Sequence, residues 1–151
     1  MKERPGDINL NMGVSDSEGR LFFYDMVPAA MSTFSEERAK ELVKMGGKLK
    51  KEIEVPVTTM REIFNKWFKG ETVDFCTVDT EGMDLKVLKS NDWTKYRPRV
   101  LCVEAVVVAG SAADVKEEET VANFLSTVGY KKAAITKIFG NQLNAIYVPK
   151  S

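Results

Sequence analysis

The sequence has 151 residues, which fits one ordinary domain and leaves no room for a second full one. Its 22 basic residues balance its 22 acidic residues. A chain without net charge has no overall field to draw it onto nucleic acid or an anionic membrane, so we expect no nucleic acid and no membrane as a partner. A charged ligand must therefore be bound by a local group of charged residues.

The absence of histidine and the presence of two cysteines limit the chemistry. Histidine is the commonest general base, so carboxylate, lysine, tyrosine or water must substitute for it. Cys76 and Cys102 lie in apolar runs without C-x-x-C spacing, which indicates reduced core residues and not a disulfide or a metal pair. MKERPGD has no apolar segment, and Glu104 interrupts the longest apolar stretch, so we expect no signal peptide, no transmembrane helix and a cytoplasmic location.

The first third of the chain predicts two strands and a helix. Residues 8–14 and 21–27 are strand-like and are joined by a polar turn that contains a glycine, which favours a hairpin-like element. Thr33 and Glu36 then form a T-x-x-E capping box that starts a short charged helix. The helix breaks at Gly46-Gly47, and a basic stretch follows.

The next segment predicts a strand followed by a second helix. In KEIEVPV, Pro56 restricts the strand to an edge or an end of a sheet, because proline cannot donate to the ladder. Thr59 and Glu62 form a second capping box, and Gly70 stands where a helix end favours a left-handed residue. Between them lies one apolar stripe at helical spacing, which predicts core packing: Met60, Ile63, Phe64, Trp67 and Phe68.

Residues 73–107 predict a βαβ unit. VDFCTVD and RVLCVEAVV are apolar runs without clean alternation, as in parallel strands that are buried on both faces. Each run carries a carboxylate at its end, Asp79 in the first and Glu104 in the second. Ligands in open α/β sheets bind beyond the carboxyl ends of the strands, so both residues are candidate site residues, and parallel neighbours would place them close together.

The last part predicts a helix and two strands. The helix covers 114–128, with Asp114 as its cap and Val121, Phe124, Leu125 and Val128 on its apolar face. Gly140-Asn141 marks a tight hairpin after it. We expect strands near 73–79, 99–107, 132–139 and 143–149 to share one sheet, the first two parallel and the last two antiparallel.

Several short motifs follow one another in a fixed order along this chain. They are V-P-V-T-T-M at 55–60, D-T-E-G at 79–82, V-L at 87–88, R-P at 97–98 followed by Glu104, G-Y at 129–130 and N-A-I-Y at 144–147. In this order they resemble the C-terminal part of the FkbM family of S-adenosylmethionine-dependent methyltransferases. Upstream, GVSDSEGRLFFYD and MSTFS resemble the family's third strand and the hairpin after it, so the likeness spans nearly the whole chain.

The resemblance implies an α/β fold with a Rossmann-like class I methyltransferase sheet that is partial and mostly parallel, with a C-terminal antiparallel hairpin. It implies a single partial domain over 1–151, in which 1–53 form the third-strand and hairpin region and 54–151 form the βαβ core and C-terminal hairpin. The sequence has no counterpart of the family's opening strand, its D-x-G-A-N-x-G loop or the acidic residue after its second strand. We therefore expect a truncated frame or a fragment, and the activity of this chain alone is an open question.

The chemistry that the resemblance implies is methyl transfer from S-adenosylmethionine to a hydroxyl of a sugar or natural product. Asp79 is the first choice of base, and Glu104 beside it could hydrogen-bond the acceptor; together the two could hold a divalent cation. Glu81 is the third catalytic candidate. The structural alternatives are that Asp79 caps the helix that starts near Gly82 and that Glu81 favours the positive end of that helix.

The resemblance also implies which residues contact the cofactor. Val14, Ser15 and Asp16, at the end of the family's third strand, would meet the adenine, with an ordinary turn as the alternative. A non-catalytic module that binds a glycan or a partner stays open as a second function. A different doubly wound nucleotide-sugar or phosphate enzyme ranks last, because the chain has no P-loop and no G-x-G-x-x-G.

The strand order that the resemblance implies has a further consequence. Two absent strands would leave VDFCTVD with an unpaired apolar edge, without the charges or proline that protect such edges. We therefore expect the chain either to self-associate through residues 73–79 or to pair INLNMGV with that strand as a substitute neighbour.

Overall fold

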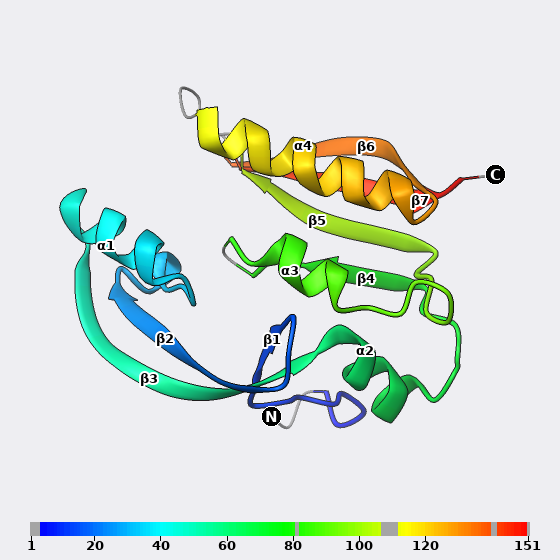
Figure 1. Ribbon diagram of the computed structural model, residues 1–151, viewed down its shortest axis with the longest axis horizontal. Helices are drawn as coiled ribbons and strands as arrows, with labels where there is room; N and C mark the ends of the chain where they lie inside the picture. Colours follow the sequence, from blue (N-terminus) through cyan, green and yellow to red (C-terminus); the bar gives the residue numbers. More distant parts are fainter. Residues whose placement is uncertain (1–3, 81, 107–111, 140–141, 151) are drawn as a thin grey trace.

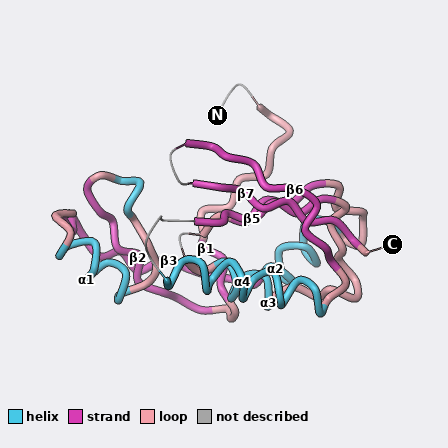
Figure 2. Tube along the Cα trace, turned by 90° about the horizontal axis from the view of Figure 1, so that it is seen from above, coloured by secondary structure: helices cyan, strands magenta, loops and turns pink. Residues whose placement is uncertain are grey.

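The computed structural model describes residues 4–80, 82–106, 112–139 and 142–150. Within them, seven strands form a three-stranded sheet and a four-stranded sheet (Figure 1). Helices α3 (Asp84–Lys89) and α4 (Ala112–Thr127) lie on the same face of the four-stranded sheet, as the view from above shows (Figure 2). Helix α1 (Glu36–Lys44) lies at the far end of the three-stranded sheet.

The three-stranded sheet has the order β1-β3-β2. Its strands are β1 (Gly13–Ser15), β2 (Gly19–Val27) and β3 (Lys48–Thr59). Strand β3 pairs with β1 in parallel and with β2 antiparallel. The expected hairpin between the first two strands is therefore wrong, because β3 lies between them and takes up the hydrogen bonds of both.

Pro56 lies at the place where β3 changes from one neighbour to two. It is opposite Arg20 of β2, and the pairing of β3 with β1 begins only at Val57. On the β1 side, Pro56 is therefore at an edge, where its missing N–H costs no ladder bond. The expected edge position of Pro56 is therefore found on the β1 side of β3 and not on the β2 side.

Helix α1 begins two residues later than the capping box predicted. Its N-cap is Ser35, whose Oγ accepts from the Arg38 N–H at 3.2 Å, while Thr33 Oγ1 accepts from the Ser35 N–H at 3.1 Å. Ala39 and Leu42 are buried and pack against Met26 of β2. The short 3-10 helix η1 (Ala29–Met31) connects β2 to this segment.

The N-cap of the second predicted capping box is confirmed. Thr59 is the N-cap of α2 (Met60–Ile63), and its Oγ1 accepts from the Glu62 N–H at 3.2 Å. The chain continues as a π-helical turn, η2 (Phe64–Phe68), which ends at Lys69 in the left-handed region with φ 50°. Phe64 is buried, but Trp67 is 39% exposed, so the expected core position of Trp67 is wrong.

The four-stranded sheet has the order β4-β5-β7-β6. Its strands are β4 (Phe75–Val78), β5 (Val100–Val106), β6 (Tyr130–Phe139) and β7 (Gln142–Pro149). The pairs β4–β5 and β6–β7 are parallel and antiparallel, as predicted. Because β5 and β7 are also antiparallel, both sheets are mixed, and the expectation of a mostly parallel sheet is wrong. Residues 140–141 of the predicted hairpin lie outside the described residues.

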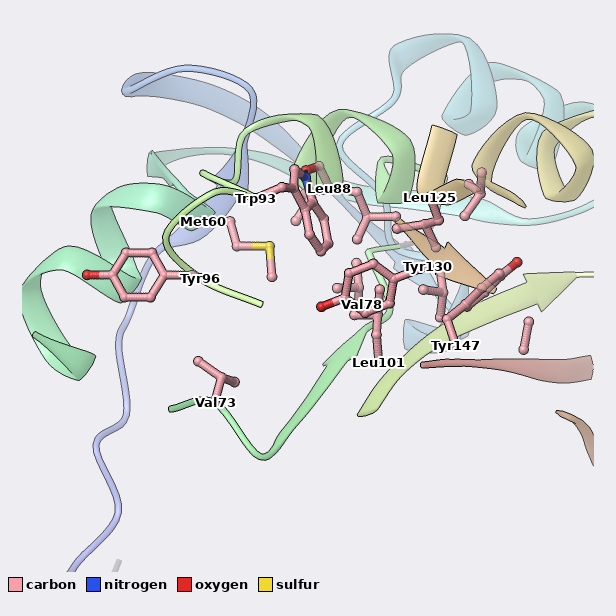
Figure 3. Close-up of a cluster of buried hydrophobic side chains, with 14 of the residues drawn as sticks. Met60, Val73, Val78, Leu88, Trp93, Tyr96, Leu101, Leu125, Tyr130 and Tyr147 are labelled. Atoms are coloured by element: carbon pink, nitrogen blue, oxygen red, sulfur yellow. The ribbon is translucent and has the colours of Figure 1, made fainter. Parts of the chain in front are cut away.

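The main core lies between the four-stranded sheet and the helices on its face (Figure 3). Trp93 and Tyr130 meet edge to face with ring centroids 5.3 Å apart. Their polar atoms are also satisfied, because Trp93 Nε1 donates to the Leu88 carbonyl at 2.9 Å and the Tyr130 hydroxyl donates to the Pro98 carbonyl at 2.8 Å. Val121 and Leu125 of α4 are buried here, which confirms the apolar face predicted for that helix.

In the part of the chain that the structure describes, no helix is long and apolar enough to cross a membrane.

Candidate functional site

A cleft of about 240 Å³ lies beside β4, on the side away from β5. Three consecutive residues of β4 line it, and since neighbouring side chains point to opposite faces of a strand, the cleft follows the edge of β4. Its lining comes from β1, α2, η2, β4, the loop after β4, and α3: Val14, Met60, Ile63, Phe64, Cys76, Thr77, Val78, Asp79, Thr80 and Val87.

Ser90 connects two walls of this cleft, α2 and α3, by hydrogen bonds. Its Oγ accepts from the Met60 N–H at 2.9 Å and donates to the Val87 carbonyl at 2.6 Å. Its own carbonyl accepts from the Arg61 N–H at 3.3 Å. The N-terminus of α2 has orphan N–H groups, as every helix does, and Ser90 at the end of α3 supplies acceptors for two of them. The positions of Met60 and Val87 across the cleft are thereby fixed relative to each other.

Asp79 is the carboxylate that the structure places at the cleft. It directly follows the β4 residues that pair with β5, and its side chain is exposed. Helix α3 begins only at Asp84, with Met83 as its N-cap, so Asp79 does not cap that helix. The structural alternative for Asp79 is therefore wrong, and the carboxylate is available to a molecule in the cleft.

Asp84 contacts the loop that lines the cleft, and the sequence did not predict this. Its side chain is buried, and its Oδ1 accepts from the Thr80 N–H at 3.0 Å and from the Thr80 Oγ1 hydroxyl at 3.1 Å. Burial raises the pKa of Asp84, the hydrogen bonds from Thr80 oppose that shift, and the nearby Asp79 charge adds to it. Asp84 thus holds the loop that carries Asp79. The sequence did hold a signal for this contact. Gly82, which has φ +93°, lies between Thr80 and Asp84, and a glycine in this conformation lets the chain turn back on itself.

Glu104 lies at the same end of the sheet as Asp79 but not in the cleft. The β4–β5 register ends with Val78 opposite Val103, so Asp79 and Glu104 follow at the same carboxyl end. Glu104 continues in β5 and pairs with Asn144 of β7, one strand farther from the cleft. Glu81, the third catalytic candidate, lies outside the described residues.

Of the three cofactor candidates, Val14 lines the cleft, and Ser15 and Asp16 are not in its described lining. Val14 of β1 is half-buried and lines the cleft together with Asp79. Ser15 is buried, and its Oγ donates to Asp16 Oδ1 at 3.2 Å, while Asp16 is exposed. Val14 and Asp79 lie far apart in the sequence, so their meeting in one cleft is a result of the fold.

Cys76 in the cleft wall has the chemistry of a core thiol. Burial raises its pKa to about 11, with a smaller contribution from Cys102. At neutral pH the thiol is protonated, so it is a poor nucleophile. Both cysteines are free, as the sequence predicted. Among the described residues, no group of three or more Cys, Asp or Glu side chains could hold a metal ion.

The family model described as the methyltransferase FkbM domain matches residues 1–131. No curated protein and no solved structure matches the chain.

Proposed function

This chain belongs to the methyltransferase FkbM domain family, and from that membership we propose that it transfers a methyl group from S-adenosylmethionine to a hydroxyl group of a sugar or natural product. The observation that carries the proposal is the meeting of Val14 and Asp79 in the cleft beside β4. Val14 stands where the family resemblance implies contact with the adenine, and Asp79 stands where it implies the acceptor.

The described lining suits the flat face of an adenine ring and a positive sulfonium. Val14, Met60 and Phe64 supply an apolar wall, which is what small-molecule sites usually offer to a flat ring. Asp79 supplies a single negative charge at the same cleft. S-adenosylmethionine would provide a methyl group that is already activated by the sulfonium, so the chain has only to position the acceptor and accept its proton.

Asp79 would accept the hydroxyl proton while the acceptor oxygen forms its bond to the methyl carbon. The donor, when bound, would supply the methyl group and keep the electron pair of the sulfur–carbon bond on its sulfur, and Asp79 would hold the hydroxyl proton. With no histidine in the chain, an exposed carboxylate at the cleft is the best-placed base among the described residues. Thr80 and Asp84 keep the loop of this carboxylate in place.

Calorimetric titration with S-adenosylhomocysteine tests the proposal. We expect micromolar or tighter binding, with a weaker affinity when Val14 is replaced by Asp. Repeating the titration with and without EDTA tests whether a divalent cation takes part. A chain that is folded by circular dichroism and does not bind the cofactor product contradicts the proposal.

The second candidate function is binding without methyl transfer, with a glycan or a protein as the bound partner. Apart from Asp79, the described lining of the cleft is apolar or neutral, which also suits binding alone. Glycan binding that is unchanged by S-adenosylhomocysteine, in a chain that does not bind this product, would support the second function over the first.

A further inference from the structure

Four lysines gather where α1 ends and β3 begins. Lys44, Lys48, Lys50 and Lys51 fall within eight residues that contain no acidic residue, and all four are exposed. We call residues 44–51, together with Val27 and Val43, the basic tip. The balanced charge of the whole chain conceals this local excess, and the expectation of no membrane partner rested on that overall balance.

The basic tip also exposes aliphatic side chains. Met45 is 77% exposed, Val27 49%, Val43 46% and Leu49 37%. Val43 and Leu49 line one groove, and the strand register places Val27 directly opposite Lys48. Four of the large apolar side chains that the molecule exposes therefore lie among its densest group of lysines.

The basic tip stands apart from the candidate site. Helix α1 and the start of β3 form one end of the molecule, away from the four-stranded sheet in both views (Figures 1 and 2). A groove of about 380 Å³ between α1 and the β2–β3 pair opens at this end, and Val43, Lys44 and Leu49 are in its lining. A surface docked at the tip would leave the cleft beside β4 accessible.

We propose that the basic tip docks on the surface of an anionic lipid bilayer. Clusters of four or more lysines beside apolar side chains are the pattern that anionic membranes attract. Lysine stems can lie along an apolar boundary while the ammonium groups reach the headgroups, and Met45 and Val43 can enter the boundary between them. Lys50 pairs with Asp25 at 3.3 Å, so Lys44, Lys48 and Lys51 contribute most of the attraction.

The composition of the tip favours a bilayer over a protein surface or a single-stranded nucleic acid. Protein interfaces are enriched in arginine and aromatic residues and are poor in lysine. Single-stranded nucleic acids are bound by aromatic residues on which bases stack. Residues 43–51 contain lysine, valine, methionine, leucine and glycine, with neither arginine nor an aromatic residue.

Vesicle sedimentation of the 151-residue chain tests the proposal. We expect binding to vesicles of phosphatidylcholine with phosphatidylserine, little binding to pure phosphatidylcholine, and loss of binding in high salt. The double substitution Lys48→Gln and Lys51→Gln should weaken the partition coefficient about thirtyfold. Met45→Asp should weaken it as well, because it removes the side chain that enters the boundary.

The matched control is Lys66→Gln with Lys89→Gln, which removes two exposed lysines far from the tip in sequence and should leave binding unchanged. A Met45→Trp variant gives a second readout, because brominated lipids should quench its added fluorescence. Circular dichroism confirms that each variant is folded. Equal binding to both vesicle types would overturn the proposal, and so would equal affinities of the tip and control variants. Binding to heparin or RNA without binding to vesicles would overturn it as well.

Discussion

Asp84 accepts two hydrogen bonds from Thr80, one from the backbone N–H at 3.0 Å and one from the hydroxyl at 3.1 Å. Asp92 makes the same arrangement with Thr94, at 3.0 Å and 2.6 Å. The two pairs differ in burial: Asp84 is 6% exposed, while the Asp92 pair is at the surface. Burial raises the pKa of Asp84, whereas the Thr94 hydrogen bonds lower the pKa of Asp92.

The first prediction is that Asp84→Asn and Asp92→Asn change the pH dependence of stability in opposite directions. The raised pKa of Asp84 means that its contribution to stability is full below the unfolded pKa and is lost as the pH rises through the folded pKa. Asp84→Asn keeps an acceptor for Thr80 without the charge, so it should be at least as stable as the wild type at pH 7. Urea unfolding between about pH 3 and pH 7 measures this.

Asp92→Asn is the matched control, because the lowered pKa of Asp92 stabilises the fold above the unfolded pKa and this contribution is lost as the pH falls. Asp92→Asn should therefore cost stability at pH 7 and not at pH 3. If the free energy of unfolding depends on pH in the same way for both variants, burial does not shift the pKa of Asp84 relative to that of Asp92, and the prediction is wrong.

The second prediction concerns the proposed base. Asp79→Asn should lower the rate of methyl transfer by about two orders of magnitude or more and change stability little, because Asp79 is exposed and lies at the cleft. Initial rates with a radiolabelled methyl donor and a sugar acceptor measure it. Asp74→Asn, at the other end of β4 and paired with Arg99 at 3.1 Å, is the control and should keep its rate. Wild-type turnover in Asp79→Asn would remove Asp79 from the mechanism.

The third prediction tests the link between the cleft walls. Ser90→Ala removes the acceptor of the Met60 N–H, while the Val87 carbonyl keeps its hydrogen bond from the Ser90 N–H at 3.0 Å. With one donor left unsatisfied, the substitution should cost about 1–3 kcal/mol of unfolding free energy. Ser126, which accepts from the exposed Lys150 ammonium at 2.8 Å, provides the control substitution Ser126→Ala, expected within about 0.5 kcal/mol of the wild type. Denaturant unfolding that gives both variants the same cost would contradict the link.

The fourth prediction concerns the edge of β4. Within the described residues, β4 has β5 as its one hydrogen-bonded neighbour, because β1 pairs with β3. Phe75, which starts β4 and is not among the residues that line the cleft, is 59% exposed. Of the two outcomes expected from the sequence, we therefore propose self-association through this edge. Light scattering during size-exclusion chromatography should show oligomers that Phe75→Lys reduces. Ile135→Lys on the opposite edge strand, at a residue 52% exposed, should leave them unchanged, and a wild-type monomer would rule the association out.

The parts of the fold that depend on local patterns were predictable. The Thr59 cap, the β4–β5 pair and the β6–β7 pair follow from capping residues, apolar runs and a turn signal within a few residues of each element. The pairing of Ser15 with Thr59 was not predictable, because nothing in the short run GVS identifies a partner so far along the chain. The predicted hairpin failed for this reason.

Two further misses have geometric causes. Trp67 was placed in the core by a period of 3.6 residues, but the Lys69 N–H donates to the Phe64 carbonyl at 3.1 Å, five residues back, so the wider π-helical turn rotates Trp67 outward. Asp84 was missed because its burial depends on the loop folding back across Gly82. At the candidate site, the sequence placed Asp79 and Glu104 at the ends of neighbouring parallel strands, as the structure confirms, but it could not show that only Asp79 lines the cleft. The roles of Asp79 and Val14 stay predictions.

Strand β3 is a single unbroken element that carries Leu49 near one end and Thr59, the cap of α2, at the other. At about 3.3 Å per residue, the separation between these two residues is roughly 30 Å along the strand. The strand therefore acts as a spacer of set length. If the basic tip rests on a bilayer, this length along the curved strand is the most by which β3 can separate the tip from the wall of the cleft at α2, so an acceptor that projects from the membrane lies within reach.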